Sequence, residues 1–231
     1  MPTQPVPIVI LGAGSIVSDA HLPAYEQNNL PVIGLYDPDY EKAKALGQKF
    51  NISVFKDPAE AAAIQNCIFD LAIPPLAHHK VLELIPENSA VILQKPMGSN
   101  LSEASNILTL CRKKSLNACV NFQLRFAPMM IALKDIINKG LIGEIVDIDM
   151  WAALDTPWNL WKFLEDLPRV EILLHSIHYF DAIRFLVGSP HGVHAKTMGH
   201  PASKISNTRT AAILDYGQDL RCAVSINHNH N

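Results

Sequence analysis

Short apolar runs alternate with helical patterns along the first half of the chain, and few polar positions interrupt the apolar runs. Strands are predicted over residues 6–11, 32–36, 52–55, 69–73, 90–93 and 118–122. Helices are predicted up to about residue 28, with a bend near Pro23, and over residues 40–50, 59–65, 77–84 and 102–114. Because strands covered on both faces are almost continuously apolar, this half is predicted to form a parallel, doubly wound α/β sheet with helices on both sides.

The pattern changes after about residue 121. Helices are predicted over residues 128–138 and 170–187, and strands over residues 144–152, 193–198, 209–216 and 220–227. Gly217-Gln218-Asp219 joins the last two strands and is typical of a hairpin. The second half is therefore predicted to be α+β with an open antiparallel or mixed sheet, and the two domains are predicted to span residues 1–121 and 122–231.

The last predicted strand stops in mid-alternation within Asn227 to Asn231. An unfinished sheet leaves backbone N–H and C=O groups unpaired at its edge, which proteins normally avoid. The second domain is therefore expected to be incomplete, and its open sheet is expected to pack against another copy of the chain in a homo-oligomer.

Composition narrows the class of protein. Of the 231 residues, 48% are apolar and 18% are charged, which supports a sizeable folded core. The net charge of −3 offers no basic field for a nucleic-acid backbone. The sequence begins without the basic region of a signal peptide, and no run approaches the ~18 apolar residues of a membrane span. Four scattered cysteines fit a reducing compartment, so a soluble, cytoplasmic protein is expected, with neither nucleic acid nor membrane as a partner.

Gly12-Ala13-Gly14 follows the first predicted strand and opens a helix. Glycines at such a turn let backbone N–H groups approach a pyrophosphate at the positive end of the helix. Gly12, Gly14, Ser15 and Ile16 are therefore candidate dinucleotide contacts. The third small position of the usual fingerprint is Val17, a departure that is expected to loosen the packing of helix on strand.

Asp37 ends the second predicted strand, 23 residues after Gly14. A carboxylate there accepts hydrogen bonds from a ribose 2′-hydroxyl and repels a 2′-phosphate. The nearest following cation is Lys42, so NAD is favoured over NADP. The alternative for Gly12-Ala13-Gly14 is an ordinary turn between a strand and a helix. The alternative for Asp37 is an Asp-Pro turn.

Further motifs follow the glycine loop in a fixed order. They are His21 with Pro23, Pro74-Pro75-x-x-His78, Gln94-Lys95-Pro96, Asn121-Phe122-Gln123-Leu124-Arg125-Phe126-Ala127-Pro128 and His178-x-x-Asp181. Their order and spacing resemble the glucose-fructose oxidoreductase / inositol dehydrogenase (Gfo/Idh/MocA) family from about residue 6 to the end. The resemblance implies an N-terminal NAD(P)-binding Rossmann domain, a C-terminal open-sheet domain, and an active site between them beside the nicotinamide.

Lys95 corresponds to the lysine of the family's Glu-Lys-Pro motif and follows an apolar strand, where open α/β sheets bind ligands. Its ammonium is predicted to polarise a substrate oxygen as hydride moves. Gln94 stands where the family has glutamate, which removes a charge and is expected to lower the pKa of Lys95. The remaining candidate cofactor contacts on this side are Pro74, Pro75, His78, Gln94 and Lys95 itself. The alternative for Lys95 is a solvent-exposed lysine at the end of a strand. The alternative for His78 is a helix cap.

His178 corresponds to the family's acid/base histidine, since imidazole exchanges protons near neutral pH. Many members carry an aspartate four residues earlier, but here that position is Leu174. Glu171 stands seven residues before His178, a spacing that α-helical geometry places on the same face, and the sequence leaves open whether it compensates for the missing aspartate. Asp181 is interpreted as either structural or catalytic.

The candidate substrate contacts are Lys95, Arg125, Trp158, Trp161, His175 and His178. The tryptophans are alternatively core residues. Glu171, His175 and His178 also have a spacing that metal ligands use on a helix, but no fourth ligand is evident, and no metal is expected.

The sequence thus predicts an NAD-dependent dehydrogenase that transfers hydride between nicotinamide and a hydroxyl or carbonyl of a sugar, cyclitol or related polar molecule. Lys95 and His178 are its predicted catalytic residues. A non-catalytic dinucleotide- or sugar-sensing regulator on the same fold is the main alternative, and an assembly subunit is a third.

Overall fold

The structure is a computed structural model, and it describes residues 4–158, 164, 169–201 and 203–229. The chain divides into two compact units, Met1–Asn121 and Phe122–Asn231. Each unit has its own sheet and its own hydrophobic core.

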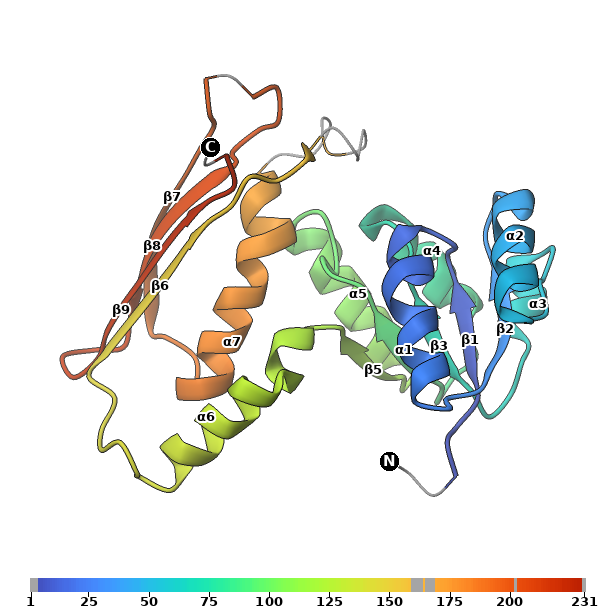
Figure 1. The fold of residues 1–231 in the computed structure, drawn as a ribbon, viewed down its shortest axis with the longest axis horizontal. Coiled ribbons are helices and arrows are strands. Elements are labelled where there is room, and N and C mark those ends of the chain that lie inside the picture. Colours follow the sequence, from blue (N-terminus) through green and yellow to red (C-terminus); the bar gives the residue numbers. More distant parts are fainter. Residues whose placement is uncertain (1–3, 159–163, 165–168, 202, 230–231) are drawn as a thin grey trace. The chain divides into compact units, whose positions relative to one another are not determined.

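The first unit is built on a five-stranded parallel sheet (Figure 1). Its strands are β1 (Ile8–Leu11), β2 (Val32–Tyr36), β3 (Ile68–Leu71), β4 (Ala90–Leu93) and β5 (Asn117–Val120), in the spatial order β2-β1-β3-β4-β5. The chain reverses its direction of winding between β1 and β3. In open α/β sheets of this kind, ligands bind where that reversal separates the strand ends. The predicted parallel, doubly wound sheet is confirmed.

Five α-helices connect these strands: α1 (Leu22–Gln27), α2 (Tyr40–Phe50), α3 (Pro58–Ala62), α4 (Pro75–Leu84) and α5 (Leu101–Lys113). Side-chain oxygens of Asp39, Asp57 and Asn100 accept hydrogen bonds from backbone N–H groups in the first turns of α2, α3 and α5. These caps satisfy donors that the helix itself leaves unpaired, and they explain where the three helices begin.

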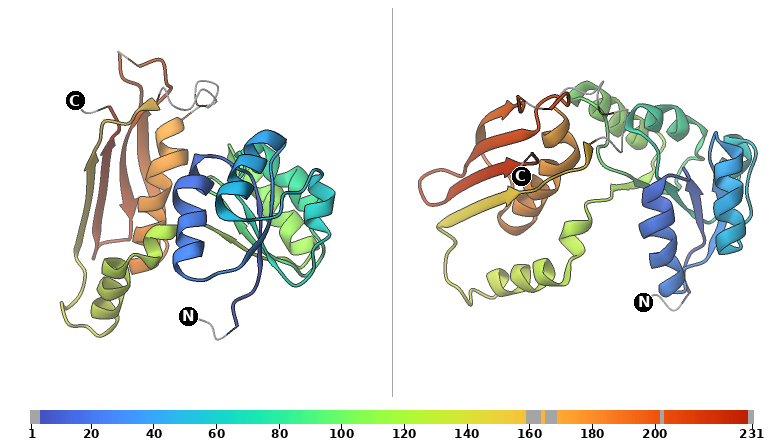
Figure 2. Two further views of the ribbon diagram at one scale, coloured as in Figure 1. Left: turned by 45° about the vertical axis from the view of Figure 1, so that its right-hand side comes forward. Right: turned by 45° about the horizontal axis from the view of Figure 1, so that its top comes forward.

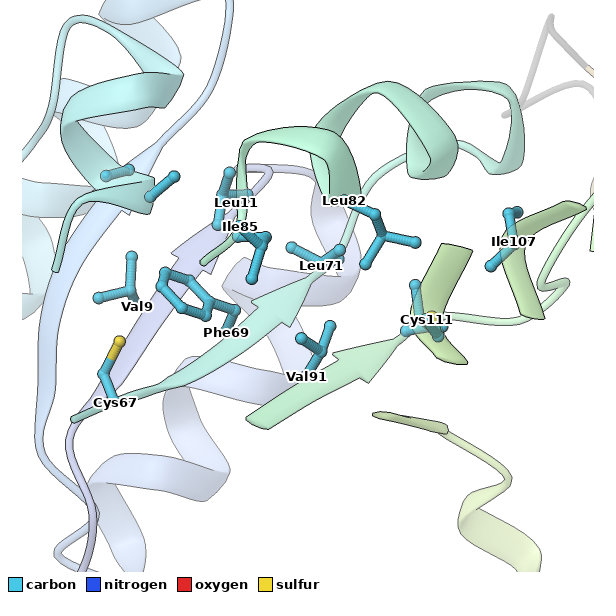
Figure 3. Close-up of a cluster of buried hydrophobic side chains, with 13 residues drawn as sticks. Val9, Leu11, Cys67, Phe69, Leu71, Leu82, Ile85, Val91, Ile107 and Cys111 are labelled. Carbon is cyan, nitrogen blue, oxygen red and sulfur yellow. The ribbon is translucent and has the colours of Figure 1, made fainter. Parts of the chain in front are cut away.

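The core of the first unit lies on both faces of its sheet. Successive residues of a strand point to opposite faces, so Val9 and Leu11 join one cluster while Ile8 and Ile10 join the other. Figure 3 shows the first of these clusters, where Phe69 lies among side chains from β1, β3, β4 and the helices α4 and α5. Burial on both faces explains why these strands have almost no polar positions.

The predicted strand over residues 52–55 is wrong. Val54 makes only an isolated bridge with Leu35, through hydrogen bonds that Leu35 exchanges with Ser53 and Phe55. This segment follows the left-handed residue Asn51 and runs along the edge strand β2 for one residue pair, which is too little contact to form a sixth strand. Ile52 and Val54 pack against the cluster that contains Ala43 of α2, and Phe55 packs against the other cluster, so these side chains are held by packing and not by a sheet ladder.

The helix after the glycine loop is irregular. A π-helical turn, Val17–His21, precedes α1, and Pro23 stands in the first turn of α1. Residues 15–27 form one continuous helix, so Pro23 removes an internal helical hydrogen bond, and the π-helical turn stands directly before it, where such an irregularity is expected. Val17 is fully buried between β1 and α2, so the departure from a small residue at this position is accommodated inside the core.

The second unit contains a four-stranded mixed sheet in the order β6-β9-β8-β7. Its strands are β6 (Asp147–Ala153), β7 (Gly192–Met198), β8 (Arg209–Asp215) and β9 (Arg221–Asn227). β6 and β9 are parallel, and the other pairs are antiparallel. The helices are the short 3₁₀ helix η2 (Gln123–Phe126), α6 (Pro128–Asn138) and α7 (Ile177–Val187). The predicted α+β architecture and the hairpin between β8 and β9 are confirmed.

Helix α7 covers one face of this sheet (Figure 2). Ile183 packs against Ala212 and Leu214 of β8 and against Val224 and Ile226 of β9. A π-helical turn, η5 (Ile172–Ser176), leads directly into α7, so one continuous helix runs from residue 170 to residue 187 as predicted. Such π-turns shift the faces on which later side chains lie and are frequent at functional sites.

Candidate functional site

The glycine loop of the first unit has two glycines with different roles. Gly12 has a backbone φ of +113°, and a Cβ atom there would lie 2.1 Å from the carbonyl oxygen of Ala72. Internal packing therefore requires glycine at position 12. At Gly14 an added Cβ atom would meet no atom within 4 Å. The open space at Gly14 is consistent with a backbone left free for a ligand to approach.

Ser15 and Ile16 begin the helix beside that open space. The first N–H groups of a helix have no acceptor within the helix, and they lie at the positive end of its dipole. The loop therefore has the donors and the room that a pyrophosphate needs, and its residues fit a dinucleotide.

Asp37 lies directly beside this loop. Its Oδ2 atom accepts a hydrogen bond of 2.7 Å from the backbone N–H of Ala13, and its Oδ1 atom accepts one of 2.9 Å from Asp39. Each carboxylate oxygen has a second lone pair available for a hydroxyl group. The structure therefore brings together the glycine loop and the carboxylate that the sequence selected for the ribose.

Lys95 stands in the loop after β4, next to the helix start formed by Pro74 and Pro75 after β3. All four candidate cofactor segments thus follow the carboxyl ends of neighbouring parallel strands, which end at one edge of the sheet. Burial lowers the pKa of Lys95 to about 8. The lowered pKa agrees with the expected direction, and its cause is loss of solvent around the ammonium.

His78 is fully buried in α4, and its Nδ1 atom lies 3.1 Å from the carbonyl oxygen of Met97. Burial also lowers the pKa of His78, so its neutral form is favoured. This contact ties α4 to the loop that carries Lys95. We therefore interpret His78 as a residue that holds this loop in place, in preference to a direct cofactor contact.

Gln94 belongs to a buried polar cluster that the sequence analysis did not anticipate. Its Nε2 atom lies 3.3 Å from Nε2 of His21, whose Nδ1 lies 2.6 Å from Oδ2 of the fully buried Asp70. The hydroxyl of Tyr25 donates to the same carboxylate oxygen over 2.9 Å. A polar aspartate within the otherwise apolar strand β3 was the available sequence signal. The cluster anchors the residue immediately before Lys95.

The second unit holds a pocket of about 370 Å³ beside the start of α7. The residues that line it are Gln123, Leu124, Leu154, Asp155, Thr156, Pro157, His175, His178, Tyr179 and His228. Its volume is within the range of small-molecule sites, and its lining mixes apolar side chains with hydroxyl, amide and imidazole groups. Two predicted site residues, His175 and His178, are therefore brought together in one pocket.

The prediction that Glu171 shares a face with His178 is wrong. It assumed α-helical spacing, but the π-turn η5 lies between the two residues and changes their relative direction. Glu171 is fully buried and accepts hydrogen bonds from the hydroxyls of Ser176 and Thr210. Leu174 packs in an apolar cluster with Trp158 and Val170. Position 174 therefore faces the core.

His228 is one of several residues of this pocket that the sequence analysis missed. In β9 the side chains of Cys222, Val224 and Ile226 are buried beneath α7. Continued alternation places position 228 on that same face, so the strand period itself was the signal.

Arg125 forms an ion pair with Asp181. Its Nε and Nη2 atoms donate to the two carboxylate oxygens over 2.6 and 2.5 Å. This charge-assisted pair raises the pKa of Arg125 and joins η2 to α7. Arg125 lies outside the described lining of the pocket. We therefore interpret the pair as structural, which favours the structural alternative for Asp181 and weakens the substrate role of Arg125.

Trp158 lies in a hydrophobic cluster, in the core role that was the alternative to substrate contact for the tryptophans. Trp158 is 7% exposed, stacks on the ring of His175, and donates from Nε1 to the carbonyl oxygen of His228. Trp151 is exposed on β6, and Trp161 lies outside the described residues. Trp158 thus supports the pocket from behind through His175.

Neither a metal cluster nor a membrane span is found in the part of the chain that the structure describes. Histidine, cysteine and acidic side chains there form no group of three able to hold a metal ion. The same residues include no helix with both the length and the apolar character to cross a membrane.

Comparison with known proteins identifies the family. Residues 6–122 match the model of the Gfo/Idh/MocA oxidoreductase family with an NAD-binding Rossmann fold. Because this match covers half of the chain, the chain belongs to that family.

Curated relatives include D-glucoside 3-dehydrogenase of Escherichia coli K12, which is 25% identical over 197 residues, or 82% of this chain. D-apiose dehydrogenase of Paraburkholderia graminis is 26% identical over 214 residues, or 89% of this chain. The chain spans 56% of the length of each of these two relatives.

Solved structures share the fold of both units. An oxidoreductase from Agrobacterium radiobacter, crystallised with NAD+, L-tartaric acid and magnesium, has a TM-score of 0.85 at 21% identity. That match covers 99% of this chain and 68% of the other. An oxidoreductase from Thermotoga maritima has the same TM-score at 16% identity, covering 99% of this chain and 74% of that one. At these identities the likeness establishes the fold alone.

Proposed function

We propose that this chain belongs to an NAD-dependent oxidoreductase that acts on the hydroxyl or carbonyl group of a sugar, cyclitol or related polar molecule. The observation that carries the proposal is the glycine loop: Gly14 leaves open space at a helix start, with Asp37 hydrogen-bonded to the same loop. The family match and the sugar dehydrogenases among the relatives support the reaction class and the substrate class.

Bound NAD would accept the hydride from the substrate's C–H bond, or its reduced form would return it. Lys95 would place its ammonium against the substrate oxygen and stabilise alkoxide character as the C–H bond breaks. His178 would take the hydroxyl proton in oxidation and return it in reduction. Thr156, Tyr179 and Gln123 offer further hydrogen bonds for hydroxyl groups in the pocket of the second unit. Residues 1–121 would thus supply the cofactor site and Lys95, and residues 122–231 would supply most substrate contacts.

NAD is proposed over NADP because Asp37 would face the position of a 2′-phosphate. Titration with both dinucleotides should give clearly tighter binding for NAD, and equal or tighter binding of NADP would contradict this choice. Asp37→Ser combined with Pro38→Arg should narrow the difference between the two affinities.

The proposed chemistry is tested by turnover of a panel of sugars and polyols, followed through NADH absorbance. Lys95→Ala and His178→Ala should each lower turnover by about two to four decades, the usual scale of such roles. Binding of NAD should change little in both variants. Lys80→Ala and His191→Ala, exposed positions in the same two units, are the matched controls. Full activity of either active-site variant would show that the site is placed wrongly.

A sensor of dinucleotides or sugars is the second candidate function. The observation that favours it is Leu174, which lies in an apolar cluster where many family members carry a carboxylate. A sensor would bind NAD and a sugar without net hydride transfer. Measured binding together with absent NADH formation across the panel would therefore select the sensor.

The assembly and compartment are also proposals. Trp151, Val193 and Ile213 are exposed on the strands of the second sheet, and such apolar surface favours association of two copies of the chain. All four cysteines are free thiols, which fits a cytoplasmic protein.

A further inference from the structure

The fully buried Asp70 lies at the centre of the polar cluster in the first unit. It stands in β3, and its Oδ2 atom lies 2.6 Å from Nδ1 of His21 and 2.9 Å from the hydroxyl oxygen of Tyr25. A carboxyl group that is removed from water needs hydrogen-bond partners, because burying it without them is costly. Asp70 therefore fixes the rings of His21 and Tyr25 against the central part of the sheet.

His21 reaches this carboxyl group from the helix that follows the glycine loop. It is the last residue of the π-helical turn Val17–His21, and Tyr25 follows four residues later in α1. Both side chains contact the same oxygen, so this helix is tied to β3 at two points. The segment that begins with the candidate pyrophosphate donors is thus held in place through His21.

The other nitrogen of the His21 ring extends the cluster to Gln94. Nε2 of His21 lies 3.3 Å from Nε2 of Gln94. The backbone N–H of Gln94 also donates to the carbonyl oxygen of Leu71 over 3.3 Å, which continues the contact between β3 and β4 by one residue. Both the backbone and the side chain of Gln94 are therefore held, and Lys95 is the next residue.

An amide suits this contact whichever form of the His21 ring is present. The amide has N–H donors and a carbonyl acceptor, and rotation of its end group exchanges the two. An ionised glutamate, the family's residue at this position, could only accept, and it would place a second carboxylate beside the ring that Asp70 already contacts. The contact between His21 and Gln94 therefore does not depend on the charge of His21.

We propose that His21 is a positioning residue for Lys95, because it holds Gln94 at the start of the loop that presents the ammonium. Asp70 orients the His21 ring for this contact. The inference rests on the proposed function only for the role of Lys95 in the reaction. The contacts, and their effect on the Lys95 amine, belong to the protein without substrate.

Three variants separate this role from simple stabilisation of the buried Asp70. His21→Asn keeps a partner for Asp70, because the amide nitrogen of asparagine is two bonds from Cβ, as Nδ1 is in histidine, but it does not reach as far as Nε2. Gln94→Met removes the same contact from the other side with a side chain of similar length. Tyr25→Phe is the matched control, since it removes a hydrogen bond to Asp70 and leaves the contact between His21 and Gln94.

The measurement is the reactivity of the Lys95 amine in the full chain without substrate. Competitive acetylation by acetic anhydride from about pH 6 to about pH 11 gives the pKa of this amine, when the peptide that contains Lys95 is quantified by mass spectrometry. Burial lowers that pKa to about 8 in the wild type. His21→Asn and Gln94→Met should each raise it by about one unit, because a loosened loop lets water reach the ammonium. The exposed Lys80 is the internal reference.

The double variant His21→Asn/Gln94→Met should show no larger shift than either single variant, since both substitutions remove one contact. Tyr25→Phe should leave the pKa of Lys95 unchanged. An unchanged pKa of Lys95 in Gln94→Met would overturn the proposal, and this variant leaves both partners of Asp70 in place, so the result does not depend on the stability of His21→Asn. An equal shift in Tyr25→Phe would also overturn it, because the cluster would then act only by stabilising Asp70.

With an active substrate, His21→Asn should lower kcat about three- to tenfold, the worth of one neutral hydrogen bond, and change the affinity for NAD by less than about twofold. Failure of the proposed function gives a different result. Absent turnover together with the expected shifts at Lys95 would refute the oxidoreductase and leave the link from His21 to Lys95 standing. Turnover in a protein whose Lys95 amine does not respond to Gln94→Met would do the opposite.

Discussion

The two units bury their sheets in different ways. In the first unit, helices cover both faces, and all four residues of β1 are buried. In the second unit, α7 covers one face, so β8 alternates between buried residues such as Leu214 and exposed ones such as Ile213. In the first sheet the central strands are covered on both faces, whereas in the second sheet one face is exposed to solvent.

This difference explains where polar groups can lie. In the first unit, the candidate cofactor residues stand in loops at the carboxyl ends of strands, because the central strands β1, β3 and β4 hold only apolar side chains and the paired Asp70. In the second unit, one helix and a half-covered sheet leave space for a pocket lined by three histidines. In the first unit, the proposed cofactor would therefore be bound mainly by backbone groups of loops at strand ends. In the second unit, side chains that line the pocket would contact the proposed substrate.

The largest expected effect tests the contrast in burial. Phe69→Ala in β3 should lower the free energy of unfolding by about 3–5 kcal/mol, because Phe69 is fully buried in the cluster of the first unit. Ile213→Ala should change it by about 0.5 kcal/mol or less, since this side chain is 58% exposed. All three tryptophans belong to the second half of the chain, so their fluorescence reports its unfolding, while far-UV circular dichroism reports both units. An equal loss of stability in the two variants would contradict the comparison.

The second prediction separates packing from ligand binding within one loop. Gly12→Ala should destabilise the first unit by about 3 kcal/mol, because its Cβ atom would collide with the carbonyl group of Ala72 at an unfavourable φ. Gly14→Ala meets open space, so its unfolding transition should stay within about 0.5 kcal/mol of wild type. Its affinity for NAD should nevertheless fall about tenfold or more by calorimetric titration. Unchanged NAD affinity in Gly14→Ala would remove the loop from the cofactor site.

The third prediction concerns pH. Burial lowers the pKa of Lys95 to about 8, so its ammonium is present below that pH and is lost as the pH rises through it. If the ammonium polarises the substrate oxygen, kcat/KM should fall about tenfold for each pH unit above about 8. Lys95→Arg keeps its charge throughout this range, so any activity it retains should lack the alkaline fall. Activity that rises above pH 8 would instead assign the neutral amine as a base.

The smallest expected effect concerns the open face of the second sheet. If two copies associate there, Ile213→Lys should weaken association about tenfold by placing a charge in the contact. Sedimentation velocity over a range of concentrations would measure this change. Leu101→Lys, which adds the same single positive charge at an exposed apolar position of α5 in the first unit, should leave association unaltered. A wild-type protein that stays monomeric at every concentration would refute association through this face.

Sequence patterns were most informative where the spacing of apolar residues within one segment was enough to predict a strand or a helix. The apolar runs and their turn residues predicted all five strands of the first sheet, and alternation predicted the strands of the second. The strand predicted over residues 52–55 is absent because the apolar side chains of this segment pack into both clusters of the first unit while its backbone makes a single bridge to β2. An apolar run predicts that a segment is buried. Whether that segment joins a sheet depends on the segments that lie beside it in the folded protein.

The candidate site also has one part that the sequence predicts and another part that depends on the tertiary structure. Strand ends, glycine spacing and the carboxylate at position 37 are local features, so the sequence alone predicted which loops stand at this edge of the first sheet. The second pocket depends on the π-turn in the helix before His178, which turns Glu171 towards Thr210 and leaves Leu174 in the core. It also depends on contacts between His175 and His228, which are 53 residues apart. Local periodicity carries no information about a shifted helical turn or about distant partners, so tertiary structure alone assembled the histidines behind this pocket.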